Sequence, residues 1–197
     1  MLIYFGALGV GFMLVEIPTI QRLTVYLGRP VYSLAVGLFA LLLFSGLGSL
    51  WVGRRLWQPH TRQPEGVGTT PGPHAHAQGR SLGLPLLVVL IALNALAGPL
   101  VLERTIGWPL AARLAVAVVI LAPLAFLMGM PFPTGIRQVG ARRPGVIPWL
   151  WGINGVMSVM GSALSIALAI HLGVRATLLI AAGCYALAGV VTGNSHL

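Results

Sequence analysis

The sequence predicts an all-α fold, a polytopic membrane bundle of about six transmembrane helices. Of its 197 residues, 57% are hydrophobic and only 8% are charged, whereas soluble domains carry about 25% charged residues. The mean hydropathy is +0.91, and a chain of this size cannot hide so much apolar surface from water. The charged residues lie between long apolar runs, so residues 1–197 are interpreted as a single membrane domain.

Six apolar runs are each long enough to cross a bilayer, which takes about 20 helical residues. In chain order they are Leu2–Ile20, Tyr32–Val52, Leu82–Leu102, Pro109–Met130, Pro148–Leu172 and Val174–Val191. The last two runs are separated by little more than Gly173, which predicts a tight turn. The first run has no basic start and contains Glu16, which favours a membrane helix over a signal peptide.

The arginines predict the orientation of the bundle. Seven arginines fall in the connections after the second and fourth runs, and four fall on the opposite side. Because arginine-rich loops face the cytoplasm, both termini are expected there. The segment 57–80 is rich in Pro, Gly and Thr, and we expect it to be a mobile cytoplasmic loop between the second and third helices.

The shortage of acidic residues excludes most hydrolase and metal sites, which need several carboxylates. The chain has three acidic residues, all of them Glu, so we expect no catalytic residues, no metal and no cofactor. His74 and His76 form only an isolated pair in the loop. Although the net charge is +9, the arginines form no stripe, which excludes nucleic acid as a partner. The lipid bilayer is the expected environment.

Glu16 is the one acidic residue that falls inside an apolar run. An ionisable group at that depth costs a few kcal/mol unless it faces a cavity or a partner. Two interpretations stay open: a cation-coupled or proton-coupled site, or an interfacial glutamate that reaches water or pairs with Arg22. The nearby Pro18 and Gln21 indicate that the helix loosens here, and Gln21 is a second candidate functional polar residue.

Small residues recur at helical spacing in two runs and predict close helix packing, which is favoured over a substrate path. They are Ser45, Ser49 and Gly53 in the second run, and Ser158, Gly161, Ser162 and Ser165 in the fifth. Asn154, near the start of the fifth run, is a third candidate functional polar residue. Its amide can cap an unwound turn, bond a neighbouring helix or line a pathway, with capping or packing favoured.

Three stretches carry a resemblance to a known family. They are YFGALGVGFMLVEIPTIQRLTVYLGRPVYSLAVGLFALLLFSGLGSL (4–50), LAFLMGMPFPTGIR (124–137) and VIPWLWGINGVMSVMGSALSIALAI (146–170). In this order they resemble the C-terminal membrane region of bacterial spermidine synthase-like proteins. The resemblance covers nearly the whole chain except the 57–80 loop, and it implies a location in the bacterial cytoplasmic (inner) membrane.

In that family, the membrane helices are fused to a soluble aminopropyltransferase-like domain, so the resemblance implies a partner of this kind. The catalytic aspartate of that domain has no counterpart in a chain without Asp, and we expect no enzyme activity from this chain on its own. The stretch GLGSLWVGRR (46–55) is also similar to the glycine/arginine motif of major facilitators, although it lacks the motif's Asp. This similarity implies half of a major-facilitator-like fold.

Three functions are compatible with these observations. The first is a non-catalytic membrane module of a spermidine synthase-like system, which anchors a soluble domain or handles a cationic, polyamine-type substrate. The second is a half-transporter that pairs with another membrane half or forms a homo-oligomer. The third is a structural helix bundle without a substrate.

Overall fold

The computed structural model describes residues 1–56, 83–141 and 143–194, and this part of the chain is helical without strands. The helices are α1 (Leu2–Leu27), α2 (Pro30–Leu56), α3 (Gly83–Thr105), α4 (Leu110–Met128), α5 (Pro131–Gly140), the short 3-10 helix η1 (Pro144–Val146) and α6 (Ile147–Asn194). The predicted all-α class is confirmed. The 57–80 loop, together with its histidines and Glu65, lies outside the described residues.

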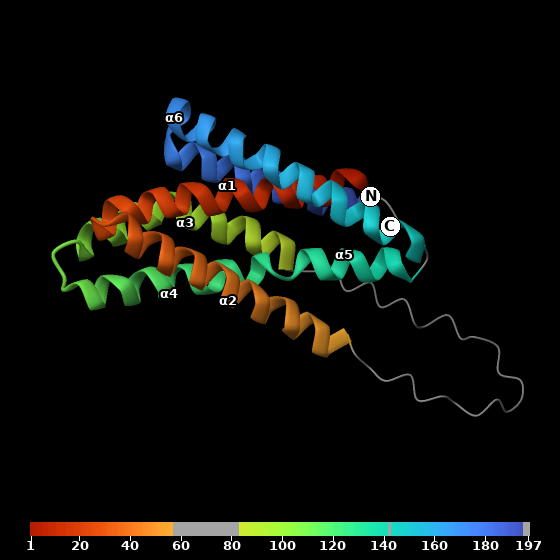
Figure 1. Cartoon of the computed structure of the whole chain (residues 1–197), viewed down its shortest axis with the longest axis horizontal. Coiled ribbons are helices and arrows are strands. Elements are labelled where there is room, and N and C mark those ends of the chain that lie inside the picture. Colours follow the sequence, from red (N-terminus) through yellow and green to blue (C-terminus); the bar gives the residue numbers. More distant parts are fainter. Residues whose placement is uncertain (57–82, 142, 195–197) are drawn as a thin grey trace, which may run out of the picture.

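Five helical segments of the described chain are long and apolar enough to cross a membrane. The sequence predicts six runs, and the difference arises in α6, a helix of 48 residues. Gly173, within α6, has φ 85° and ψ 161°, a backbone conformation that essentially only glycine adopts. The chain turns back at this point, so that both parts of α6 run along α1 (Figure 1).

Two helix ends differ from the predicted runs. α1 continues from Ile20 to Leu27, where Gly28 (φ 74°) donates its backbone N–H to the Thr24 carbonyl. The predicted loosening near Pro18 is wrong, because α1 is continuous through this residue; a proline removes only one helical hydrogen bond. The end of α4 at Met128 lies two residues before the predicted end of the fourth run, and Pro131 then begins the short helix α5.

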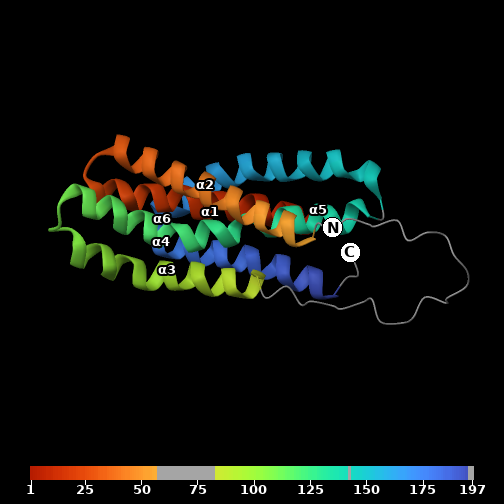
Figure 2. The same cartoon turned by 90° about the horizontal axis from the view of Figure 1, so that it is seen from below.

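The start of α1 and the end of α6 lie at the same end of the bundle (Figures 1 and 2). We call this end the terminal end. The opposite end, which contains the α1–α2 turn at Gly28, is called the hairpin end. α1 runs from the terminal end to the hairpin end and is the most enclosed of the apolar helices.

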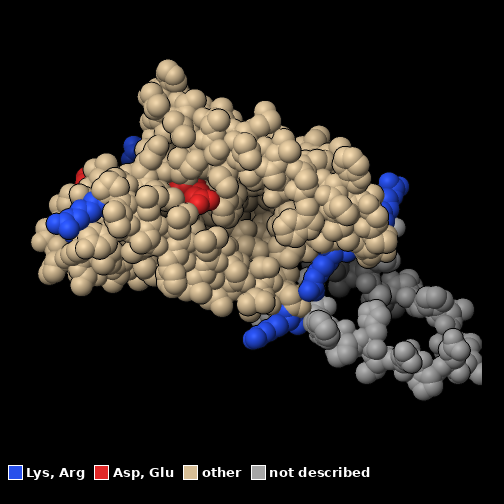
Figure 3. All heavy atoms as spheres, viewed as in Figure 1, with Lys and Arg blue, Asp and Glu red and all other residues tan. Residues whose placement is uncertain are grey.

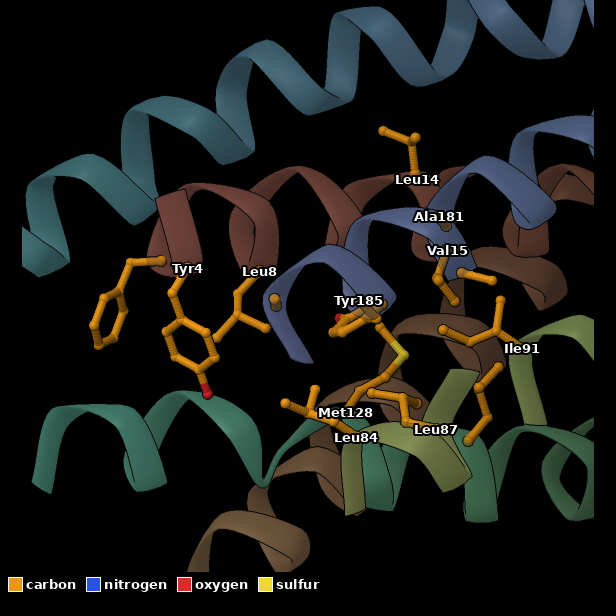
Figure 4. Close-up of a cluster of buried hydrophobic side chains, with 14 of the residues drawn as sticks. Tyr4, Leu8, Leu14, Val15, Leu84, Leu87, Ile91, Met128, Ala181 and Tyr185 are labelled. Atoms are coloured by element: carbon orange, nitrogen blue, oxygen red, sulfur yellow. The ribbon is translucent and has the colours of Figure 1, made fainter. Parts of the chain in front are cut away.

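The core surrounds α1 (Figure 4). The fully buried side chains of Phe5 and Leu14 on α1 belong to the same cluster as Leu87 on α3 and Tyr185 on α6. The Tyr4 hydroxyl points to α5 and donates a hydrogen bond to the Pro131 carbonyl at 2.8 Å. This contact fixes the junction of α4 and α5 against the start of α1.

α2 and α4 cross with their backbones in contact. A methyl group added at Gly48 of α2 would meet the carbonyl of Phe126, and one added at Gly129, directly after α4, would meet the carbonyl of Ser45. Glycine is therefore required on both sides of the crossing. This close approach brings Ser45 and the α4–α5 junction to the edge of the same cavity.

Candidate functional site

A cavity of about 430 Å³ lies between α1, α2, the α4–α5 junction and α6. Its lining consists of Leu8, Phe12 and Met13 of α1, Leu42, Ser45, Gly46 and Ser49 of α2, Met128, Gly129, Phe132 and Pro133 at the junction, and Asn154, Ser158 and Tyr185 of α6. No charged residue is among these described lining residues. A hollow is visible near the middle of the face drawn in Figure 3.

Three polar residues of the lining each donate one hydrogen bond to a helix backbone. The Asn154 amide (Nδ2) donates to the Phe5 carbonyl at 3.0 Å, and the Ser158 hydroxyl donates to the Asn154 carbonyl at 2.8 Å. The Ser45 hydroxyl donates to the Leu42 carbonyl at 3.3 Å. The amide oxygen and the hydroxyl lone pairs are left as acceptors. The cavity is therefore rich in acceptors.

Tyr185 is a functional candidate that the sequence analysis does not identify. Its side chain is 1% exposed, yet its hydroxyl makes no hydrogen bond with another described residue and the ring lines the cavity. A methyl group added at Gly11 would lie 3.1 Å from this ring, so glycine leaves room for Tyr185 beside α1. The available signal is a tyrosine in the middle of an apolar run, whereas membrane tyrosines concentrate at the interfaces.

Asn154 therefore bonds a neighbouring helix and also lines the cavity. The helix is not unwound at this position, so the proposed capping role is wrong. The contact between α1 and α6 is close here, since a methyl group at Gly9 would lie 2.5 Å from the Asn154 carbonyl oxygen. Asn154 thus joins the wall of the cavity to the packing of α1.

Glu16 is half-buried and does not line the cavity. It follows the lining residues Phe12 and Met13 by four and three positions, which places it one turn further along the same face of α1. The Glu16 side chain makes no hydrogen bond or ion pair with any other residue of the described chain. Its suggested partner, Arg22, instead donates to the carbonyl oxygen and side-chain oxygen of Asn94 on α3.

Gln21 is half-buried on α1 and makes no side-chain hydrogen bond within the described part of the chain. It lies towards the hairpin end and is not among the residues that line the cavity. Of the three candidate polar residues, the structure therefore places Asn154 in the cavity wall, Glu16 beside it and Gln21 away from it.

The predicted small-residue positions have different surroundings. Gly161 faces the backbone of Val10, and a methyl group there would lie 2.9 Å from the Val10 Cα. Ser165 is fully buried, whereas the Ser162 hydroxyl bonds the Val159 carbonyl of its own helix. Ser45, Ser49 and Ser158 line the cavity, and Gly53 accepts a hydrogen bond from Arg137 at 3.4 Å through its carbonyl.

The fold and the site together define a multi-helix bundle of membrane type with an acceptor-rich cavity that opens to the surface. Comparison with known proteins finds no matching family model, no similar curated protein and no similar solved structure.

Proposed function

We propose that the chain is a multi-pass membrane module that binds an organic amine of the polyamine type in the cavity beside Tyr185. The observation that carries this proposal is the acceptor-rich lining, in which Asn154, Ser158 and Ser45 each donate to a helix backbone and keep oxygen lone pairs as acceptors. A protonated amine brings N–H donors and needs acceptors around it. The Tyr185 hydroxyl, which bonds no other residue in the described part of the chain, adds a further acceptor.

Aromatic rings and one acidic residue support the choice of a cation. Phe12, Phe132 and Tyr185 line the cavity, and aromatic faces attract ammonium groups. Glu16 supplies a negative charge one turn along α1. Charged groups within a membrane are expensive. A negative charge that pairs with no residue of the described chain therefore favours a cationic ligand or a proton.

The module itself is proposed to be non-catalytic. The resemblance to spermidine synthase-like proteins supports a soluble aminopropyltransferase-like domain as the partner, which the module would anchor or supply with its amine. We place the module in a bacterial cytoplasmic membrane with six crossings, the last two joined at Gly173. Both termini then face the cytoplasm, in agreement with the positions of the arginines.

A half-transporter of major-facilitator type is the second candidate. It is favoured by the first part of α6, where large apolar side chains stay uncovered: Trp149 is 73% exposed, Val159 72% and Ile170 74%. A second membrane half or a second copy of the chain would cover this face, whereas lipid covers it in the first candidate. If no amine binds, the third candidate function, a structural helix bundle without a substrate, is favoured.

The amine site is tested by removing a single oxygen atom. Tyr185→Phe is expected to raise the Kd for spermidine about tenfold, because a hydrogen bond to a charged group contributes about 1.5–3 kcal/mol. Titration calorimetry on the purified protein in detergent measures this change. Tyr26→Phe is the matched control, since the Tyr26 hydroxyl bonds Thr105 at 2.8 Å away from the cavity. Equal Kd values for the native protein and Tyr185→Phe would contradict the assignment.

A further inference from the structure

A second, much smaller cavity lies between α1, α3 and α4. Its volume is about 10 Å³, which is the space of a single water-sized particle. It is lined by Thr19, Arg22 and Leu23 of α1, Asn94, Gly98 and Leu102 of α3, and Ala117, Ile120 and Leu121 of α4. Thr19, Arg22 and Asn94 are its polar residues, and all three side chains carry N–H or O–H donors.

The donors of this small cavity are incompletely used. Thr19 is 4% exposed, and its buried hydroxyl has no hydrogen-bond partner among the described residues. Asn94 accepts from Arg22 through its side-chain oxygen at 3.3 Å, and its amide hydrogens bond no other described residue. A buried donor without a partner carries a desolvation cost, and the Thr19 hydroxyl is such a group in this cavity.

The positive charge of Arg22 is also uncompensated. Its guanidinium donates to the Asn94 carbonyl at 2.9 Å, and Arg175 donates to the Leu96 carbonyl, two residues further on, at 3.4 Å. Two guanidinium groups thus bind neighbouring carbonyls of α3 with no carboxylate bonded to either in the described chain. Glu16 precedes Arg22 by six residues, about 9 Å along α1 and about 240° around it, so it does not share the Arg22 face.

Gly98 makes room for this arrangement. A methyl group at this position would lie 2.8 Å from Arg22 Nη1, so any larger residue would displace the guanidinium from the Asn94 carbonyl. The neighbouring Pro99 lies inside α3 and has no N–H, so it cannot donate to the Ala95 carbonyl four residues earlier. A carbonyl oxygen has two lone pairs, so the Asn94 carbonyl can accept a guanidinium donor beside its helical hydrogen bond.

We propose that the cavity formed by Thr19, Arg22 and Asn94 binds one small monovalent anion of halide size. The guanidinium supplies the charge, and the Thr19 hydroxyl and the Asn94 amide supply two further donors. The small volume excludes phosphate and organic acids. The site is independent of the amine cavity, because no residue lines both cavities.

The test compares thermal unfolding of the purified protein in chloride and in gluconate at equal ionic strength. Because a ligand that binds only the folded state raises its stability, we expect the midpoint to rise with chloride and to saturate. Thr19→Val should raise the half-saturating chloride concentration about tenfold, and Arg22→Gln should abolish the dependence. Arg113→Gln is the matched control, since Arg113 bonds the Tyr26 carbonyl at 2.9 Å outside the cavity, and it should keep the chloride dependence.

A crystal grown in bromide gives a readout that does not depend on the folding of a variant. The proposal predicts an anomalous scattering peak bounded by Thr19, Arg22 and Asn94. A cavity that holds only water would give no peak there and equal midpoints in chloride and gluconate. Either of these results would overturn the proposal, as would a chloride dependence that Arg22→Gln leaves unchanged.

Discussion

Replacing Gly129 with alanine is expected to lower the free energy of unfolding by about 3 kcal/mol or more, at or above the upper end of the usual cost of overpacking. The added methyl group would meet the carbonyl of Ser45 on α2. Backbone atoms lie on both sides of this contact, so no side-chain rotation relieves it and the helices themselves must separate. Gly48→Ala should have a similar effect through the Phe126 carbonyl.

Gly46→Ala is the matched control for this crossing. Gly46 lies on α2 two residues before Gly48, and a methyl group there would meet nothing within 4 Å. Alanine is the better helix former by about 1 kcal/mol, so this variant should be as stable as the native protein or slightly more stable. Reversible unfolding in detergent measures all three variants. Equal stability of Gly129→Ala and Gly46→Ala would show that the helices do not cross as described.

Glu16→Gln is expected to reduce the flux of spermidine into protein-containing lipid vesicles about tenfold or more. The substitution keeps the shape of the side chain and removes its charge, and an interaction with a charged partner contributes about 1.5–3 kcal/mol. Glu16 has no partner in the described chain, so its charge is free to act on a passing cation or proton. The measurement is the initial rate of uptake of labelled spermidine.

Glu103→Gln makes the same chemical change at an exposed position near the end of α3. It should leave the flux unchanged, and the unfolding midpoints of both variants should match that of the native protein. A native rate in Glu16→Gln would remove Glu16 from the path of the amine. A native protein that binds spermidine without any flux would instead favour a module that hands its amine to a soluble partner.

Most of the fold can be predicted from the lengths of the apolar runs in the sequence. The runs predict every long helix of the described chain, because a bilayer requires about 20 apolar residues per crossing. The turn at Gly173 is also predicted, since little more than this residue separates the last two apolar runs. The true end of α1 at Leu27 is not predicted, because Gln21 and Arg22 look like the end of a membrane helix. Contacts with α3 keep Arg22 inside the bundle instead.

The site is predicted only in part. Asn154 and the serines at positions 45, 49 and 158 are identified from polarity and spacing, but spacing alone favours packing and cannot place them around one cavity. Tyr185 is missed because its neighbours in the cavity come from α1, α2 and the α4–α5 junction. Those contacts join residues far apart in the sequence, and the helical period of one segment carries no information about them.

The occupancy of the cavity by an amine is tested most directly by thiol protection. Ser49→Cys, in a Cys184→Ser background, places one reactive group in the cavity wall, where a permeant maleimide can label it. Spermidine is expected to slow this labelling and to reach half-protection near its Kd, whereas a neutral diol of similar length should have no effect. Labelling at the same rate with and without spermidine would contradict an amine site in this cavity.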